Sequence, residues 1–152
     1  MNSIWGYSVE DQEYKSLKQL IHLLVGAAGK GANLLLNIGP QPSGELPEMA
    51  LTRLKEMGEW LAKYGETIYG TQMGEVTTRP WGVTTKKGNK QWIHILSLDD
   101  NALFVPIKGK VIKAVTYDGR KPLKFKQNKD GVVFELGEIP TDIDFIIELE
   151  MK

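Results

Sequence analysis

The chain has 152 residues, of which 41% are hydrophobic and 25% are charged, which suits one domain or two small ones. Its 19 basic and 19 acidic residues balance, so its overall charge does not attract nucleic acid or an anionic membrane. The absence of cysteine excludes disulfide bonds, thiolate metal sites and a cysteine nucleophile. The composition therefore predicts a globular protein with no nucleic-acid or membrane partner, and we expect no metal and no cofactor.

The sequence carries no targeting signal that assigns a compartment. Its first residues lack the basic region and the apolar core of a signal peptide. Its longest apolar run, LLLNI, is far too short to cross a bilayer.

The first predicted element is an amphipathic helix over residues 12–28. Ser8 is its predicted N-cap, and the run from Gly29 to Gly31 predicts its end. Apolar residues recur along it at spacings of three and four and form one stripe: Leu17, Leu20, Ile21, Leu24, Val25 and Ala28.

A short apolar segment, Asn33 to Ile38, follows between Gly31 and the Gly39-Pro40 pair. Its length and boundaries predict a buried strand. QPSGE is a predicted loop, and Pro47 suits the first turn of a second helix that ends at Gly65. The apolar stripe of this helix comprises Ala50, Leu54, Met57 and Leu61. A helix, a buried strand, a loop and a helix in this order are typical of an α/β layer or barrel.

After Gly70 the pattern changes to short runs that are rich in β-branched and aromatic residues. These runs are QWIHILSL, ALFVPI, VIKAVTY, VVFEL and DFIIELE. Turn signals separate them, and the Asp118-Gly119 and Asp130-Gly131 pairs are typical of hairpins, because glycine accepts the positive φ of a type I′ turn. We therefore predict an α+β chain, with an α/β segment over residues 1–73 and an antiparallel β-sandwich over residues 74–152.

Two residue patterns in the first half suggest a chemical site. Gly26, Gly29 and Gly31 have the spacing of a phosphate-binding loop, but such loops open a helix whereas these glycines close one, so we interpret them as a helix stop. Glu45 and Glu48 lie beyond the predicted strand, at the edge where α/β proteins place active sites, and a carboxylate pair can serve acid–base catalysis. The interpretation that we favour is that Glu48 complements the positive end of the helix dipole.

The histidines and the aromatic residues of the second half do not form a recognisable site. His22 and His94 have no second ligand at metal spacing, and they lie in different halves, so no Ser/His/Asp arrangement is expected. We interpret both as packed or solvent-facing residues. Trp81, Trp92 and Phe104 offer the components of a sugar-stacking platform, but aromatics in a sandwich this small more often pack, which is the role that we predict.

Three motifs occur in a fixed order in the first half of the chain. They are SIWGY at residues 3–7, GKGANLLLNIGPQPSGELPE at residues 29–48 and LKEMGEWLAKYGETIYGT at residues 54–71. Together they resemble the late-barrel region of family 29 glycoside hydrolases, the α-L-fucosidases. The resemblance implies that residues 1–73 are the last elements of a (β/α) barrel, with two helices and one or two strands. It also implies that the β-sandwich is the family's carboxyl-terminal domain.

The resemblance further implies a retaining glycosidase mechanism. In such enzymes an aspartate attacks the anomeric carbon, and a glutamate acts as acid and then as base. In the family the aspartate precedes the SIWGY motif, as does the glutamate in many members, and the fucose-binding histidines come earlier still. Glu10, Asp11 and Glu13 follow the motif and match neither position. We therefore expect the intact parent to hydrolyse α-L-fucosyl bonds, and this chain alone to have no catalytic residue and no activity.

One sugar-binding residue is carried over from the resemblance. Trp5 occupies the motif position at which the family presents an aromatic ring to the apolar face of the bound sugar. Asn37 and the loop from Gly39 to Glu45 would lie at the rim of the active site, although we favour a structural role for Asn33 and Asn37. The implied partners are fucosylated glycans, bound by the intact parent, and the family implies a secreted, periplasmic or lysosomal parent.

Two other interpretations stay open. A freestanding carbohydrate-binding or interaction module would keep the same β-sandwich, and a small hydrolase would use Glu45 and Glu48 without a supporting base or metal. An incomplete barrel would leave the strand over residues 33–38 with an unpaired edge and the stripe over residues 17–28 partly uncovered. Such surfaces favour self-association.

Overall fold

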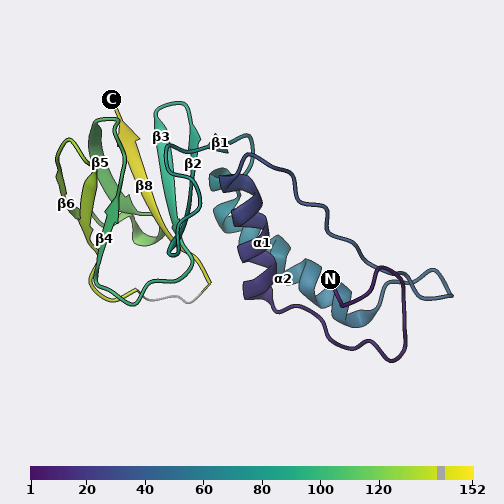
Figure 1. The fold of residues 1–152 in the computed structure, drawn as a ribbon. Coiled ribbons are helices and arrows are strands. Elements are labelled where there is room, and N and C mark those ends of the chain that lie inside the picture. The colour runs from purple at the N-terminus through teal and green to yellow at the C-terminus, as the bar shows by residue number, and fades with distance from the viewer. Residues whose placement is uncertain (140–142) are drawn as a thin grey trace.

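The computed structural model describes residues 1–139 and 143–152, and it places two helices beside a two-sheet sandwich (Figure 1). The helices are α1 (Leu17–Gly29), α2 (Glu48–Tyr64) and the short 3-10 helices η1 (Gly65–Thr67) and η2 (Asp118–Arg120). The strands are β1 (Gln72–Met73), β2 (Gly82–Lys87), β3 (Lys90–Ile95), β4 (Ala102–Val105), β5 (Val111–Thr116), β6 (Lys124–Gln127), β7 (Val132–Glu135) and β8 (Phe145–Met151). Within these described ranges, neither helix has the length and apolar content needed to cross a membrane.

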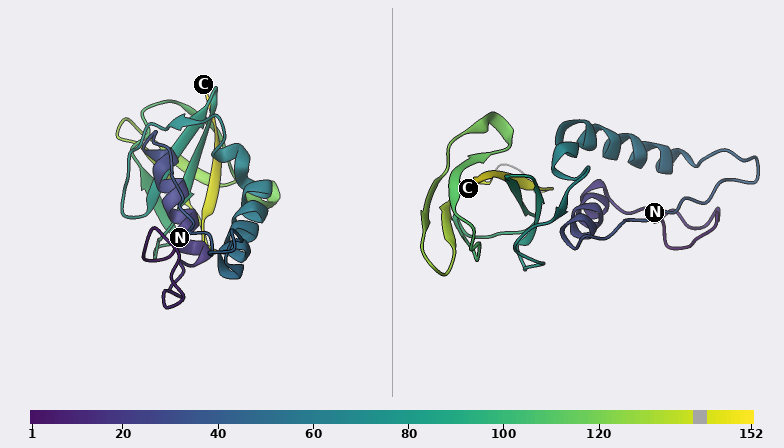
Figure 2. Two further views of the ribbon diagram at one scale, coloured as in Figure 1. Left: turned by 90° about the vertical axis from the view of Figure 1, so that its right-hand side faces the viewer. Right: turned by 90° about the horizontal axis from the view of Figure 1, so that it is seen from above.

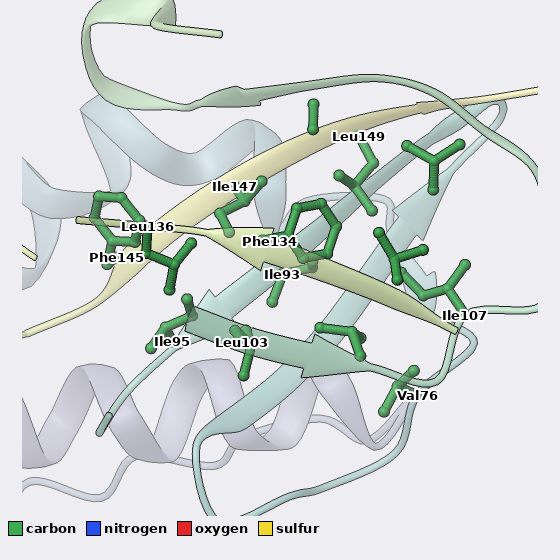
Figure 3. Close-up of a cluster of buried hydrophobic side chains, with 14 residues drawn as sticks. Val76, Ile93, Ile95, Leu103, Ile107, Phe134, Leu136, Phe145, Ile147 and Leu149 are labelled. Atoms are coloured by element: carbon green, nitrogen blue, oxygen red, sulfur yellow. The ribbon is translucent and has the colours of Figure 1, made fainter. Parts of the chain in front are cut away.

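The predicted antiparallel β-sandwich is confirmed. Its larger sheet has the strand order β1-β2-β3-β8-β5, its smaller sheet has the order β4-β7-β6, and neighbouring strands are antiparallel. Apolar side chains of both sheets meet between them, with Ile93 and Ile147 from the larger sheet and Leu103 and Phe134 from the smaller one (Figure 3). The strands β4 and β7 of the smaller sheet bury alternate residues, whereas β3 and β8 of the larger sheet are buried on both faces.

The Asp118-Gly119 pair reverses the chain, as the sequence predicts: the main-chain N–H of Thr116 donates to the main-chain oxygen of Lys121 at 2.9 Å, and that of Leu123 donates to Ala114 at 3.0 Å. The pair lies in η2, where the chain passes from β5 in the larger sheet to β6 in the smaller one. Gly119 has a φ of 71°, so its role in supplying a left-handed turn residue holds. The sequence signal reports the local backbone conformation and not the sheet that receives the next strand.

The two helices cover the outer face of the larger sheet, on the side away from the smaller sheet (Figure 2). Side chains from the helices and the sheet make a second core: Leu20, Ile21, Val25, Ala50, Met57, Trp60, Val83, Trp92 and Ile146. Because neighbouring strand residues point to opposite faces, Trp92 of β3 lies in this core while Ile93 lies in the sandwich core. The proposed division between residues 73 and 74 therefore separates two segments that share one core.

α1 begins later than the sequence pattern predicts. Ser16 and not Ser8 is its N-cap: Ser16 Oγ accepts from the main-chain N–H of Gln19 at 3.2 Å, and Gln19 Oε1 accepts from that of Ser16 at 2.8 Å. This reciprocal capping box satisfies two N–H groups at once, which explains why the helix starts there. The predicted stop is confirmed, since α1 ends at Gly29 and Gly31 has a φ of 67°.

The buried strand predicted over residues 33–38 is not formed. The segment is an irregular connection between α1 and α2, and no ladder partner for it exists within residues 1–139 and 143–152. Leu35 is 78% exposed, whereas Leu36 and Ile38 pack partly against the second core. A strand requires neighbours that satisfy its backbone hydrogen bonds, so an apolar pattern alone does not produce one.

The close crossing of α1 over β2 leads to a first prediction. A Cβ added at Gly29 would lie 2.4 Å from the Cβ of Val83, so Gly29→Ala overpacks the second core. Overpacking costs about 1–3 kcal/mol, and we expect denaturant melts to show a loss of that size in the free energy of unfolding.

Gly26→Ala is the matched control for this substitution. Gly26 lies in the same helix, and nothing approaches within 4 Å of an added Cβ. Removing a helix-interior glycine should therefore stabilise the chain by roughly 0.5–1 kcal/mol. Equal effects of the two substitutions would contradict the close crossing.

Candidate functional site

The SIWGY motif forms a loop that hydrogen bonds to the main chain hold in place. Asp11 Oδ2 accepts from the main-chain N–H groups of Ser3 at 3.0 Å and Ile4 at 3.1 Å. On the other side of the loop, Asn37 Nδ2 donates to the main-chain oxygen of Trp5 at 2.6 Å. The indole of Trp5 is left 73% exposed, so the loop presents it to solvent.

Gly39 allows this loop to lie directly against the segment that follows Asn37. A Cβ at residue 39 would come within 2.4 Å of the carbonyl carbon of Gly6 and 2.6 Å of the main-chain nitrogen of Tyr7. Backbone atoms cannot move aside as a flexible side chain can, so only glycine fits. The structure thus brings together Trp5, Asn37 and Gly39, which the sequence places on two separate motifs.

A small hollow of about 190 Å³ lies beside the loop. Residues 1–5 line one side of it and residues 34–37 line another, with Lys15 and Leu23 between them. Ile4, Leu23 and Leu35 are exposed apolar side chains on this part of the molecule. The surface around Trp5 therefore combines these apolar side chains with the polar side chains of Asn2, Ser3 and Lys15.

Glu45 and Glu48 do not form a catalytic pair in this structure. Glu45 is exposed, and its Oε2 accepts from Ser43 Oγ at 3.3 Å. Glu48 is also exposed and opens α2, where its charge complements the helix dipole, as the favoured interpretation predicts. In the part of the chain that the structure describes, no group of three or more acidic or histidine residues is placed to hold a metal ion.

The two histidines come from different segments, as the sequence indicates, but they bond to adjacent residues, Ile143 and Asp144. His22 Nε2 donates to the main-chain oxygen of Ile143 at 2.7 Å, and His94 Nδ1 lies 2.7 Å from Asp144 Oδ2. His94 Nε2 is 3.2 Å from Thr85 Oγ1. Asp144, His94 and Thr85 thus repeat the acid–imidazole–hydroxyl order of nucleophilic catalysis.

This trio is nevertheless not an active site. His94 and Thr85 have no exposed surface, so a substrate has no access to the hydroxyl. Thr85 Oγ1 also donates its proton to the main-chain oxygen of Thr67 at 2.8 Å. The prediction that His94 is a packed residue is confirmed. Burial raises the pKa of Asp144, against the lowering effect of His94 and His22.

The aromatic residues of the sandwich do not form a stacking platform. Trp92 is fully buried in the second core, and Trp81 packs against the sandwich core, which confirms the predicted packing roles of both. Phe104 is 49% exposed, so for this residue the packing prediction is wrong. A single exposed phenylalanine lacks the polar groups that orient a sugar.

Comparison with known proteins shows which family this chain resembles. Residues 1–66 match the sequence model of the family described as alpha-L-fucosidase. The plasma alpha-L-fucosidase of Rattus norvegicus is 36% identical over 114 residues, which make up 70% of this chain and 23% of that protein. The chain belongs to the α-L-fucosidase family. The resemblance that the three motifs indicate is confirmed.

The similarity of this fucosidase-family chain extends through the sandwich. The tissue alpha-L-fucosidase of Homo sapiens is 30% identical over an alignment of 149 positions, and the match covers 90% of this chain and 31% of that protein. The solved structure of alpha-L-fucosidase isoenzyme 1 from Paenibacillus thiaminolyticus has a TM-score of 0.88 and 31% identity, and the match covers 99% of this chain and 38% of that one. The chain therefore spans well under half the length of these relatives.

The residues that hold the Trp5 loop could be predicted only in part. The SIWGY motif and Asn37 belong to the family motifs, but Asp11 carries no sequence signal for its role. Its carboxylate accepts two main-chain hydrogen bonds from residues seven and eight positions earlier, a contact that only the folded loop creates. The Gly39-Pro40 pair predicts a turn, but it does not predict that two segments cross closely at Gly39.

The crossing at Gly39 leads to a second prediction. Gly39→Ala should force the SIWGY loop away from residues 37–39 and break the bond between Asn37 and Trp5. We expect large shifts of the Trp5 indole signal and of the amides of residues 3–7 in ¹H–¹⁵N spectra, with Trp5→Phe used to assign the indole. Gly6→Ala is the matched control, since nothing lies within 4 Å of a Cβ added at Gly6. Shifts confined to the neighbours of residue 39 would show that the loop does not depend on this crossing.

Proposed function

We propose that this chain is part of a retaining α-L-fucosidase, that Trp5 forms an aromatic wall of its sugar site, and that the two catalytic carboxylates lie outside these residues. One observation supports this most directly. The family match covers residues 1–66, which are the residues that hold the Trp5 loop against Asn37 and Gly39. The activity and the fucosylated glycan partners are those of the whole enzyme.

An exposed indole suits one part of sugar recognition. A pyranose ring presents a face of C–H groups, and an indole offers a broad flat apolar surface to pack against it. Specific binding also needs polar groups that fix the hydroxyls. The two polar side chains that hold the loop, Asp11 and Asn37, already bond to the main chain. The polar contacts to fucose are therefore assigned to other parts of the whole enzyme.

Three carboxylates of the first half, Asp11, Glu45 and Glu48, are poor candidates for catalysis. Retaining glycosidases place two carboxyl groups about 5 Å apart across the bond that is cleaved. Asp11 is occupied by main-chain N–H groups, Glu45 bonds Ser43, and Glu48 lies in the first turn of α2. These placements support the proposal that the nucleophile and the acid/base residue come from elsewhere.

The exposed apolar side chains beside the loop are proposed to contact the rest of the barrel. Ile4, Leu23 and Leu35 all belong to the segment that the family places at the end of the barrel. In the whole enzyme these side chains would be covered by the remaining barrel elements. In the isolated chain the same residues favour self-association.

The third prediction tests whether this chain contributes Trp5 to the sugar site while the catalytic carboxylates come from the rest of the enzyme. The purified chain should not hydrolyse an aryl α-L-fucoside, because hydrolysis requires both a nucleophile and an acid. A chimera in which residues 1–152 replace the matching part of the Paenibacillus thiaminolyticus isoenzyme should hydrolyse it. In that chimera Trp5→Ala should lower kcat/KM about 2- to 12-fold, which corresponds to the loss of about 0.5–1.5 kcal/mol of aromatic contact.

Phe104→Ala is the matched control in the chimera, because Phe104 is an exposed aromatic of the sandwich. Phe104→Ala should leave kcat/KM unchanged. If it lowers kcat/KM as much as Trp5→Ala does, the effect is not specific to Trp5, and Trp5 is not part of the sugar site. Hydrolysis by the isolated chain that Glu45→Gln or Glu48→Gln abolishes would support the small-hydrolase interpretation. Saturable binding of millimolar fucose by the isolated chain would support a carbohydrate-binding module.

A further inference from the structure

A buried acid–base pair lies between the helices and the sandwich. His94 is on β3, and Asp144 is on the segment that leads into β8. Both side chains are 0% exposed, and Nδ1 of His94 lies 2.7 Å from Oδ2 of Asp144. Asp144 Oδ1 is buried and has no hydrogen-bond partner. The pair plays no part in the proposed glycosidase chemistry.

The hydrogen bonds around this pair determine how many protons it holds. The main-chain oxygen of Thr67 can only accept, so the hydroxyl proton of Thr85 is committed to that 2.8 Å bond. The 3.2 Å contact between Thr85 Oγ1 and His94 Nε2 is then satisfied only if Nε2 carries a proton. His94 therefore presents an Nε2–H group to the threonine.

The contact on the other side of the ring requires a second proton. An unprotonated Nδ1 and a carboxylate oxygen are both acceptors, and two acceptors do not approach to 2.7 Å without a proton between them. That proton resides either on the imidazole, which gives an ion pair, or on the carboxyl group, which gives a neutral pair. In both cases the pair binds one proton more than a neutral histidine and a free carboxylate do.

We propose that the buried pair of His94 and Asp144 stabilises the fold by holding this proton, so that proton loss weakens the folded state at alkaline pH. Burial supports this, because it disfavours a lone carboxylate and raises the pKa of Asp144. A group whose pKa is raised by folding stabilises the fold at low pH and loses that contribution as pH rises through the raised pKa.

Within the described residues, α1, β2 and β8 each place side chains around the pair. From α1, His22 donates to the main-chain oxygen of Ile143 and its charge opposes the rise in the pKa of Asp144. The residues opposite His94 on β2 and β8 are Val83 and Ile146, which do not ionise. The next carboxylate along β8, Glu148, is paired with Arg120 at 2.8 Å and lies 3.6 Å from Lys90. Lys18 lies one turn before His22 on α1.

The pH dependence of unfolding follows from proton counting. Above about pH 7 an unfolded chain carries a neutral histidine and an ionised aspartate at these positions. The folded pair keeps one proton more, so the unfolding equilibrium constant should rise up to tenfold per pH unit until the folded pair loses that proton. Denaturant melts followed by circular dichroism between about pH 7 and pH 9 measure this slope.

Asp144→Asn is the decisive variant, because its amide supplies the missing hydrogen without ionising. An amide N–H at the position of Oδ2 would donate to Nδ1, while Nε2–H still donates to Thr85, so the same bonds form without a bound proton. We expect this variant to fold and to lose the tenfold slope. His22→Gln is the matched control, since a glutamine amide can keep the bond to Ile143, and it should retain the wild-type slope. A wild-type slope in Asp144→Asn would overturn the proposal.

A direct measurement on the unchanged chain covers the case in which Asp144→Asn does not fold. ¹⁵N spectra of the histidine rings at about pH 8, above the ordinary histidine pKa, report the protonation of each nitrogen of His94. We expect a protonated Nε2 together with either a protonated Nδ1 or a protonated Asp144 carboxyl group, the latter read from its ¹³C signal. An unprotonated Nδ1 beside an ionised Asp144 would overturn the proposal independently of any variant.

Discussion

The larger sheet has to be covered on both faces, and the rest of the structure follows from this requirement. Its strand β3 carries Trp92 and His94 on one face and Ile93 and Ile95 on the other, and all four are nearly or fully buried. The smaller sheet covers one face, and α1 with α2 covers the other. Removing the helices would return this apolar face to water at about 25 cal/mol per Å². The helical segment and the sandwich therefore stabilise each other, although their sequences have different periodicities.

The same packing supports the surface around Trp5. Met1, Leu36 and Ile38 pack against the core that α1 shares with the sheet. Contacts with the helical layer thus anchor Met1, which precedes the SIWGY loop, and the segment that carries Asn37. In this account the sandwich contributes to the sugar site indirectly, because it holds the helices against which the Trp5 loop and its supporting segment are placed.

Features that depend on neighbouring residues could be predicted from the sequence. The β-branched and aromatic residues of β3 and β8 and the glycine turns indicate the sandwich, and the stripe from Leu20 to Val25 correctly marks the buried face of α1. The start of α1 was missed because Ser8 and Ser16 are both suitable N-caps. Only Ser16 has a glutamine three residues later that completes the capping box.

Features that depend on distant residues could not be predicted in this way. The segment over residues 33–38 has the composition of a buried strand, yet a strand forms only where a partner is present. His94 and Asp144 are 50 positions apart, and no spacing rule connects them. Trp5 was found through its family motif, whereas the contacts that hold it, from Asp11 and Asn37, emerge only from the folded loop.

The central claim is that the helices and the sandwich open as one cooperative unit. Native-state hydrogen exchange tests it most directly, because it measures the opening free energy of each amide separately. Mid-helix amides of α1, such as those of Leu24 and Val25, should open with the same free energy as amides of β3 and β8, such as those of Ile93 and Ile147. Opening of α1 at a much lower free energy, while the strands stay protected, would contradict the account and would show that the sandwich is stable without its helical cover.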